Sequence, residues 1–151
     1  MVFQLFPERS RTAALRTGLP QLRVQTLFER YGTGAERIAD FLQAGADNPL
    51  ADATYSVREI VFLIRNEAVE HLDDLLLRRT TSAISGALSL AMTDATLDIL
   101  ATERGWDAER RAVERHRFLT LLAARHGVSE QTLLLRNTDR STRCETTAKS
   151  G

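Results

Sequence analysis

The feature that most constrains the fold is a strongly apolar helical stretch within residues 57–80. One face of the predicted helix carries Val57, Ile60, Val61, Ile64 and Ala68 at helical spacing. Phe62, Leu63 and Val69 lie off that face, so most of the circumference is apolar. A helix of this kind normally lies in a protein interior. Charged residues carried with it must find partners, because a buried, unpaired charge costs several kcal/mol.

Charges on and after this helix predict an ion-pair network. Glu67 lies on the helix, and Arg78 and Arg79 follow one helical hairpin later. Asp73 and Asp74 open the second helix, where carboxylates cap the first turn and interact favourably with the helix dipole. A doubled arginine can also hold a phosphate, but the nearby carboxylates already neutralise both guanidinium groups. We therefore predict a structural network rather than an anion site, a metal site or a catalytic pair.

Capping signals place the remaining helices. Ser56 or Thr54 is expected to cap the central helix, with Glu59 completing a capping box after Ser56. Other helices are predicted from Pro20 to Gly32, from Thr33 to Gly45, from Thr93 or Asp94 to Gly105, over 108–126 after Asp107, and over 130–135 after Ser129. The apolar stripe of helix 108–126 is expected to be Ala112, Val113, His116, Leu119 and Ala123. No strand pattern is present, so the fold class is all-α, a compact orthogonal bundle of about six or seven helices without a sheet.

Composition and segment boundaries limit the class of protein. The 151 residues are 43% hydrophobic with a formal net charge of zero, which predicts a globular domain and no bulk attraction to nucleic acid. The single cysteine, Cys144, excludes an internal disulfide. We interpret residues 1–18 as a linker or N-terminal extension, 19–135 as the helical domain, and 136–151 as a disordered tail.

Two other classes of function stay open. Residues 123–133 follow the spacing of a helix-turn-helix, but the second helix would present Leu133, Leu134 and Leu135 where a DNA-reading helix needs polar side chains. A stand-alone helical adaptor also fits the pattern. No pair of His71, His116 and His126 has the spacing of metal ligands on a helix, and no Gly-x-Gly-x-x-Gly dinucleotide motif follows a strand.

The central stretch resembles the C-terminal helical domain of FAD-dependent, quinone-linked (aerobic) glycerol-3-phosphate dehydrogenases. The matching residues are Glu59, Leu63-Ile64-Arg65, Glu67, Leu72-Asp73-Asp74-Leu75-Leu76 and Arg78-Arg79-Thr80. A second similar stretch is Glu103 to Arg111, around Gly105-Trp106-Asp107. The resemblance covers about Leu22 to Arg115. Phe62, Asn66 and His71 depart from it, where the family has Tyr, His and Thr.

The resemblance implies a flavoprotein, the parent, that oxidises glycerol 3-phosphate to dihydroxyacetone phosphate with FAD as hydride acceptor. FAD and substrate would be held by domains outside this chain, so no cofactor, metal or catalytic residue is expected here, and the isolated chain is expected to be inactive. Its expected partners are those FAD and substrate domains, with a homodimer as a further contact and no nucleic acid. We expect a cytoplasmic location, with the parent peripheral on the inner face of the plasma membrane.

Overall fold

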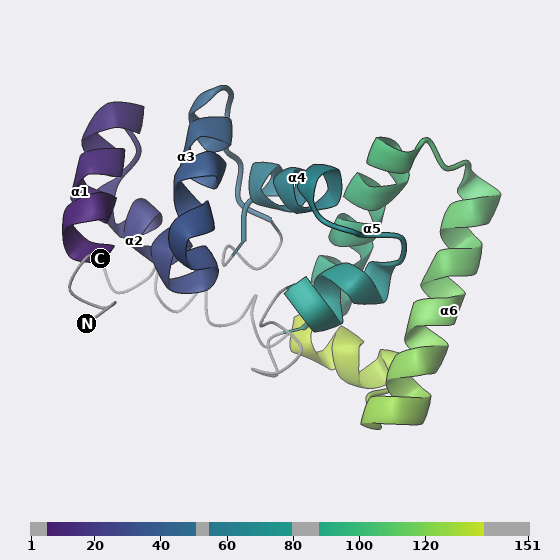
Figure 1. Cartoon of the computed structure of the whole chain (residues 1–151). Helices are drawn as coiled ribbons and strands as arrows, with labels where there is room; N and C mark the ends of the chain where they lie inside the picture. The colour runs from purple at the N-terminus through teal and green to yellow at the C-terminus, as the bar shows by residue number, and fades with distance from the viewer. Residues whose placement is uncertain (1–5, 51–54, 80–87, 138–151) are drawn as a thin grey trace, which may run out of the picture. The chain divides into compact units, whose positions relative to one another are not determined.

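The structure is a computed structural model, and it describes residues 6–50, 55–79 and 88–137. It confirms the predicted all-α class, because the regular structure of these residues is helical apart from one isolated β-bridge between Pro49 and Ser56. The chain divides into two compact units, Met1–Asn48 and Pro49–Gly151 (Figure 1). Each unit is described by itself.

The first unit consists of α1 (Phe6–Thr17), α2 (Gln21–Tyr31) and α3 (Ala35–Gln43), with the 3-10 turn η2 (Gly32–Gly34) before α3. Each of the three α-helices contacts the other two. The buried side chains are small or aliphatic, with one aromatic ring: Ser10, Ala13, Ala14, Val24, Leu27, Phe28, Ala35, Ile38, Ala39 and Leu42. This core is built mainly by α2 and α3, the two helices of this unit that the sequence predicts.

Helix α1 occupies a segment for which the sequence predicts no helix. Its buried side is formed by Ser10, Ala13 and Ala14, whereas its large apolar residue Leu15 is 83% exposed. Small buried residues give almost no hydrophobic period, so the pattern misses the helix. Salt bridges from Arg9 to Glu36 and from Arg16 to Asp40, at 3.1 and 3.0 Å, join α1 to α3.

The boundaries of α2 and α3 follow backbone geometry more than side-chain capping. Helix α2 ends at Gly32, as predicted, in a positive-φ conformation that favours glycine. The predicted cap at Thr33 is wrong, because Thr33 lies inside η2 and Gly34 precedes α3. The chain passes from α2 through η2 almost directly into α3, so no extended residue is left to act as a side-chain cap.

The second unit contains α4 (Val57–Asn66), the π-helical segment η3 (Asp74–Arg79), α5 (Leu90–Arg104) and α6 (Ala108–His126). Helices α5 and α6 run in opposite directions on either side of a tight turn (Figure 1). Ile60, Leu63 and Ile64 of α4 are at most 2% exposed, which confirms the interior position predicted for this helix. Leu72, Leu75, Leu76, Leu88, Met92, Leu97 and Leu100 continue the core.

The capping box predicted at the start of α4 is present. Ser56 Oγ accepts a hydrogen bond from Glu59 N at 3.2 Å, and a Glu59 carboxylate oxygen lies 3.5 Å from Ser56 N. Glu59 is fully buried, so both capping bonds are shielded from water. This local pair fixes where the central helix begins.

Replacing Ser56 by alanine is expected to lower the free energy of unfolding by about 1 kcal/mol, because the Glu59 N–H loses its acceptor at the helix start. Urea denaturation followed by circular dichroism measures the loss. Thr102→Ala is the control, since the exposed Thr102 hydroxyl donates only to Asp98 O within α5 and its removal should cost less than about 0.5 kcal/mol. Equal losses in the two variants would contradict the capping assignment.

The end of α4 differs from the prediction. The helix stops at Asn66, and the Asn66 side chain donates to Phe62 O at 3.0 Å. Ala68 therefore lies beyond the helix and is exposed, so it does not extend the buried face. Glu67 is also exposed, which corrects the expectation of an interior charge at this position.

Caps also set the boundaries of α5, α6 and the final helix. The sequence places the α5 cap at Thr93 or Asp94, but Ser89 caps it, with Ser89 Oγ accepting from Met92 N at 3.1 Å. Asp107 caps α6 as predicted, and left-handed Gly105 and Gly127 end α5 and α6.

Residues 130–137 form a further helix after Ser129, whose hydroxyl accepts from Thr132 N at 3.2 Å as predicted. This helix includes Arg136 and Asn137, which were expected in the tail. Arg136 donates to Leu88 O at 2.9 Å, and Asn137 Oδ1 accepts from Ala91 N at 3.0 Å. The remainder of the predicted tail lies outside the described residues.

The face of α6 that enters the core is not the predicted one. Glu114, Phe118 and Leu122 are at most 2% exposed. The residues of the predicted stripe lie on the other side: Ala112, Val113, His116 and Ala123 are exposed, and Leu119 is partly exposed. His116 is therefore a surface residue rather than a core histidine.

Candidate functional site

Glu114 is a buried carboxylate at the centre of a polar cluster in the second unit. Its Oε1 accepts the backbone N–H of Leu72 at 2.8 Å, and its Oε2 lies 3.1 Å from His71 Nδ1. Arg110 Nη1 and Arg117 Nε each approach Oε2 at 3.3 Å. Glu114 thereby fixes the segment that follows α4 to the side of α6.

The surroundings of Glu114 favour its charged form. Burial alone would raise the pKa of this carboxyl, but hydrogen bonds from Leu72 N, His71 and Arg117 outweigh burial and hold the pKa below its usual value. An ionised carboxylate can only accept hydrogen bonds. His71 Nδ1 must therefore carry the proton in this contact.

Asp74 holds the same segment through its backbone N–H groups. Its Oδ2 accepts the backbone N–H groups of Glu70 and His71, both at 3.0 Å, and its Oδ1 lies 3.6 Å from Arg78 Nη1. Burial would raise the pKa of Asp74, but these backbone hydrogen bonds and Arg78 lower it overall. The carboxylate caps the first turn that leads into η3, the role predicted for an acid at this position.

The lowered pKa values of Glu114 and Asp74 predict a loss of stability in acid. Their contribution is complete above the unfolded-state values of about 4.3 for Glu and 3.9 for Asp, and it disappears as the pH falls through the folded-state pKa values. Urea denaturation between neutral and acidic pH measures this fall. In Glu114→Gln the fall should be shallower, and an unchanged pH dependence in that variant would contradict the assignment to Glu114.

The residues of the predicted ion-pair network have different surroundings. Asp73 forms a salt bridge with Arg117, and Asp74 pairs with Arg78. Glu67 lies at the surface, so it is not the buried charge that the sequence predicted. The side chain of Arg79 lies outside what the structure describes, and pairing of Glu67 with Arg78 or Arg79 stays a prediction.

Glu114 and Arg117 make several of the contacts in this cluster, and the sequence pattern predicts neither of them as a site residue. A usable signal was present, because Glu114 lies one turn before Phe118 and Arg110 one turn before Glu114. A glutamate on the apolar side of a helix, flanked by arginines, is typical of a buried ion pair. The predicted stripe on the other side of α6 is more uniformly apolar, so the periodicity of the helix does not indicate that Glu114 is buried.

A shallow depression of about 480 Å³ opens beside the cluster. It is lined by Ala68, Val69, Glu70, His71, Arg104, Trp106 and Arg110. The guanidinium of Arg110 stacks on the Trp106 ring, 4.2 Å from its centroid. Arg104 donates to the backbone oxygens of Ile64 and Val69. These contacts order the loop after α4, and the lining side chains include no hydroxyl or thiol that could act as a nucleophile.

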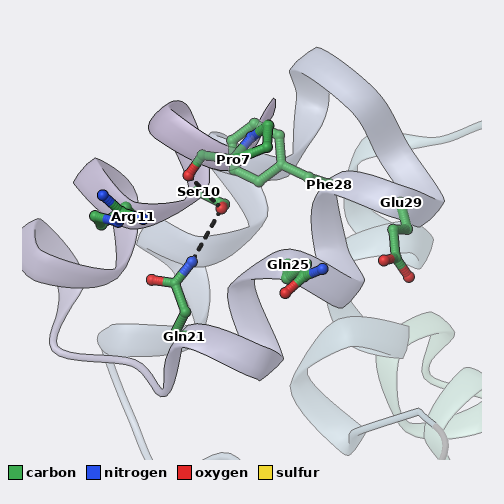
Figure 2. Close-up of a pocket in the computed structure, with 7 residues that line it drawn as sticks. All are labelled: Pro7, Ser10, Arg11, Gln21, Gln25, Phe28 and Glu29. Carbon is green, nitrogen blue, oxygen red and sulfur yellow. Dashed lines mark hydrogen bonds between the residues drawn. The ribbon is translucent and has the colours of Figure 1, made fainter. Parts of the chain in front are cut away.

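A second cavity, of about 610 Å³, lies between α1 and α2 in the first unit (Figure 2). Its lining residues are Pro7, Ser10, Arg11, Gln21, Gln25, Phe28 and Glu29. Ser10 is 1% exposed, donates to Pro7 O at 3.0 Å and accepts from Gln21 Nε2 at 3.1 Å. Because its hydroxyl is engaged in this way and no histidine lines the cavity, Ser10 is not placed as an activated nucleophile.

Among the described residues, no group of three or more His, Cys, Asp or Glu side chains is arranged to hold a metal ion. No helix among them combines the length and apolar character needed to cross a membrane.

Comparison with known protein families identifies the family. Residues 4–111 match the C-terminal domain of alpha-glycerophosphate oxidase, over more than half of the sequence. The chain belongs to this family. The match runs through α1 to α5 and into the first turn of α6, so it includes the α1 segment that the sequence pattern missed. It confirms the resemblance to the helical C-terminal domain of glycerol-3-phosphate-oxidising flavoproteins. No curated protein and no solved structure matches the chain.

Proposed function

We propose that this chain is the non-catalytic helical domain of a flavoprotein glycerol-3-phosphate dehydrogenase. FAD and glycerol 3-phosphate bind to other domains, against which the helical domain packs. In the complete enzyme the secondary alcohol of glycerol 3-phosphate loses a hydride to FAD and its hydroxyl proton, giving dihydroxyacetone phosphate. The reduced flavin passes its electrons to a quinone.

The observation that carries this proposal is the family match over residues 4–111. The use of the polar residues in the matching stretch supports it. Glu59 completes a capping box, Asp74 caps the turn before η3, and Asp73 pairs with Arg117. These groups maintain helices and loops, as expected for a supporting domain.

Two measurements on the purified chain test the division of labour. Isothermal titration with FAD and with glycerol 3-phosphate is expected to show no binding. An artificial electron acceptor is expected not to be reduced when glycerol 3-phosphate is added. A chain that is yellow with bound flavin, or that reduces the acceptor alone, would contradict a non-catalytic role.

A complementary experiment tests packing. The FAD and substrate domains of a family member, expressed without their own C-terminal domain, are mixed with this chain. We expect a complex on gel filtration and faster oxidation of glycerol 3-phosphate than with the catalytic domains alone. Failure to form a complex would count against the packing role. A complex that oxidises a different substrate would retain packing but overturn the proposed substrate.

A further inference from the structure

The cavity between α1 and α2 is lined by polar side chains that the chain itself leaves unused (Figure 2). Its volume of about 610 Å³ lies within the usual range of small-molecule sites. Arg11, Gln25 and Glu29 line it, and within the described part of the chain they make no hydrogen bond or ion pair. These groups can therefore bind a molecule in the cavity without giving up a contact inside the protein.

Arg11 differs in this respect from the other arginines of α1. Arg9 pairs with Glu36 at 3.1 Å and Arg16 pairs with Asp40 at 3.0 Å, so both hold α1 against α3. Arg11 lines the cavity instead, and no carboxylate among the described residues neutralises it. Its charge is available to an anionic group of a ligand.

Glu29 provides the opposite charge at the other end of the cavity (Figure 2). Gln21, Gln25 and Glu29 are four residues apart along α2 and follow one side of that helix. Ser10 accepts a hydrogen bond from Gln21 Nε2 at 3.1 Å, so Arg11, the next residue, lies at the Gln21 end. The helical rise from Gln21 to Glu29 is about 12 Å. The two unpaired charges are therefore well separated along the cavity.

The middle of the cavity combines hydrogen-bonding groups with apolar surface. Ser10 is 1% exposed and holds the Gln21 amide in place, and the Gln21 oxygen makes no hydrogen bond among the described residues. A glutamine amide donates and accepts, as a peptide group does, so Gln21 and Gln25 can each bond to a peptide group. Pro7 and Phe28 supply the apolar part of the lining.

We propose that this cavity binds a short peptide of about three residues with free termini, in extended form. Its carboxylate pairs with Arg11, its ammonium group pairs with Glu29, and its peptide groups bond to Gln21 and Gln25. An extended chain spans at most about 3.3–3.6 Å per residue, so three residues reach from one charged end of the cavity to the other. This binding activity is separate from the proposed function, because glycerol 3-phosphate carries no ammonium group and is not expected to bind here.

Titration of the isotopically labelled chain with trialanine, followed by NMR, tests the site. The amide resonances of α1 and α2 are expected to shift, and those of α6 to stay unchanged. Amidation of the peptide carboxylate, or acetylation of its amino group, should weaken binding about two- to fivefold. Each change removes one ion pair at an exposed side chain, and such pairs contribute modestly.

Two variants assign the charged ends of the peptide. Arg11→Gln should bind free and amidated trialanine equally, because the carboxylate no longer has a cationic partner. Glu29→Gln should bind free and acetylated trialanine equally for the corresponding reason. Arg125→Gln and Glu109→Gln are the matched controls, since both residues are exposed on α6 and neither lines the cavity. Both controls should bind trialanine as the unaltered chain does, and circular dichroism verifies the fold of each variant.

Three results would overturn the proposal. The first is the absence of shifts in α1 and α2 at millimolar trialanine. The second is an affinity that amidation and acetylation leave unchanged, or that the control variants lower as much as Arg11→Gln and Glu29→Gln do. The third is an equal response of the same resonances to glycerol 3-phosphate, because the site would then not recognise a peptide.

Discussion

Replacement of Glu114 by alanine is expected to destabilise the chain by about 2–3 kcal/mol, because the Leu72 N–H loses its acceptor and the partly exposed Arg110 and Arg117 lose a buried carboxylate. Glu114 is fully buried, and its removal leaves the Leu72 N–H without its acceptor. Arg117 keeps Asp73 but loses its contact with the buried carboxylate. Urea denaturation at neutral pH, followed by circular dichroism, measures the change.

Two further variants make this result specific. Asp98→Ala removes an ion pair of the same chemical type between α5 and α6, but Asp98 is 64% exposed, so the expected loss is at most about 1 kcal/mol. Glu114→Gln retains an oxygen that can accept from Leu72 N, and its loss should lie between those of the two alanine variants. Similar losses for Glu114→Ala and Asp98→Ala would show that the cluster does not depend on burial.

Helix ends were the part of this fold that the sequence predicted best. Ser56 with Glu59, Asp107, Gly105 and Gly127 all act as predicted. Each signal is local, because a cap involves a side chain or a glycine and a backbone group within one turn of it. The error at α5 is also local, since Ser89, Thr93 and Asp94 are all competent capping residues and only packing selects among them.

The partners of the charged residues could not be predicted in the same way. The sequence predicts the kind of interaction, carboxylates with guanidinium groups between helices, but suggests Glu67 as the acid because it lies in an apolar stretch. The early end of α4 at Asn66 puts Glu67 at the surface. Glu114, which bonds to Leu72 across 42 residues of sequence, takes the buried position. The spacing of Arg110, Glu114 and Phe118 indicates a buried acid, but no local pattern identifies Leu72 as its partner.

The orientation of α6 was ambiguous for a physical reason. The helix carries two sets of residues at helical spacing. One is the predicted stripe of Ala112, Val113, His116, Leu119 and Ala123, and the other is the buried set of Glu114, Phe118 and Leu122. The first is more uniformly apolar, and the second contains a charge. Periodicity therefore favours burial of the predicted stripe, but the network around Glu114 satisfies the charge and the large Phe118 side chain fills the core.

Phe118→Ala and Val113→Ala separate these two orientations. Phe118 is fully buried, so its truncation is expected to cost about 3–5 kcal/mol through lost burial and the cavity that remains. Val113 is 56% exposed, and Val113→Ala should change the free energy of unfolding by less than about 0.5 kcal/mol. Both are measured by urea denaturation followed by circular dichroism. The reverse order, with Val113→Ala the more damaging, would mean that α6 packs by the face its periodicity indicates.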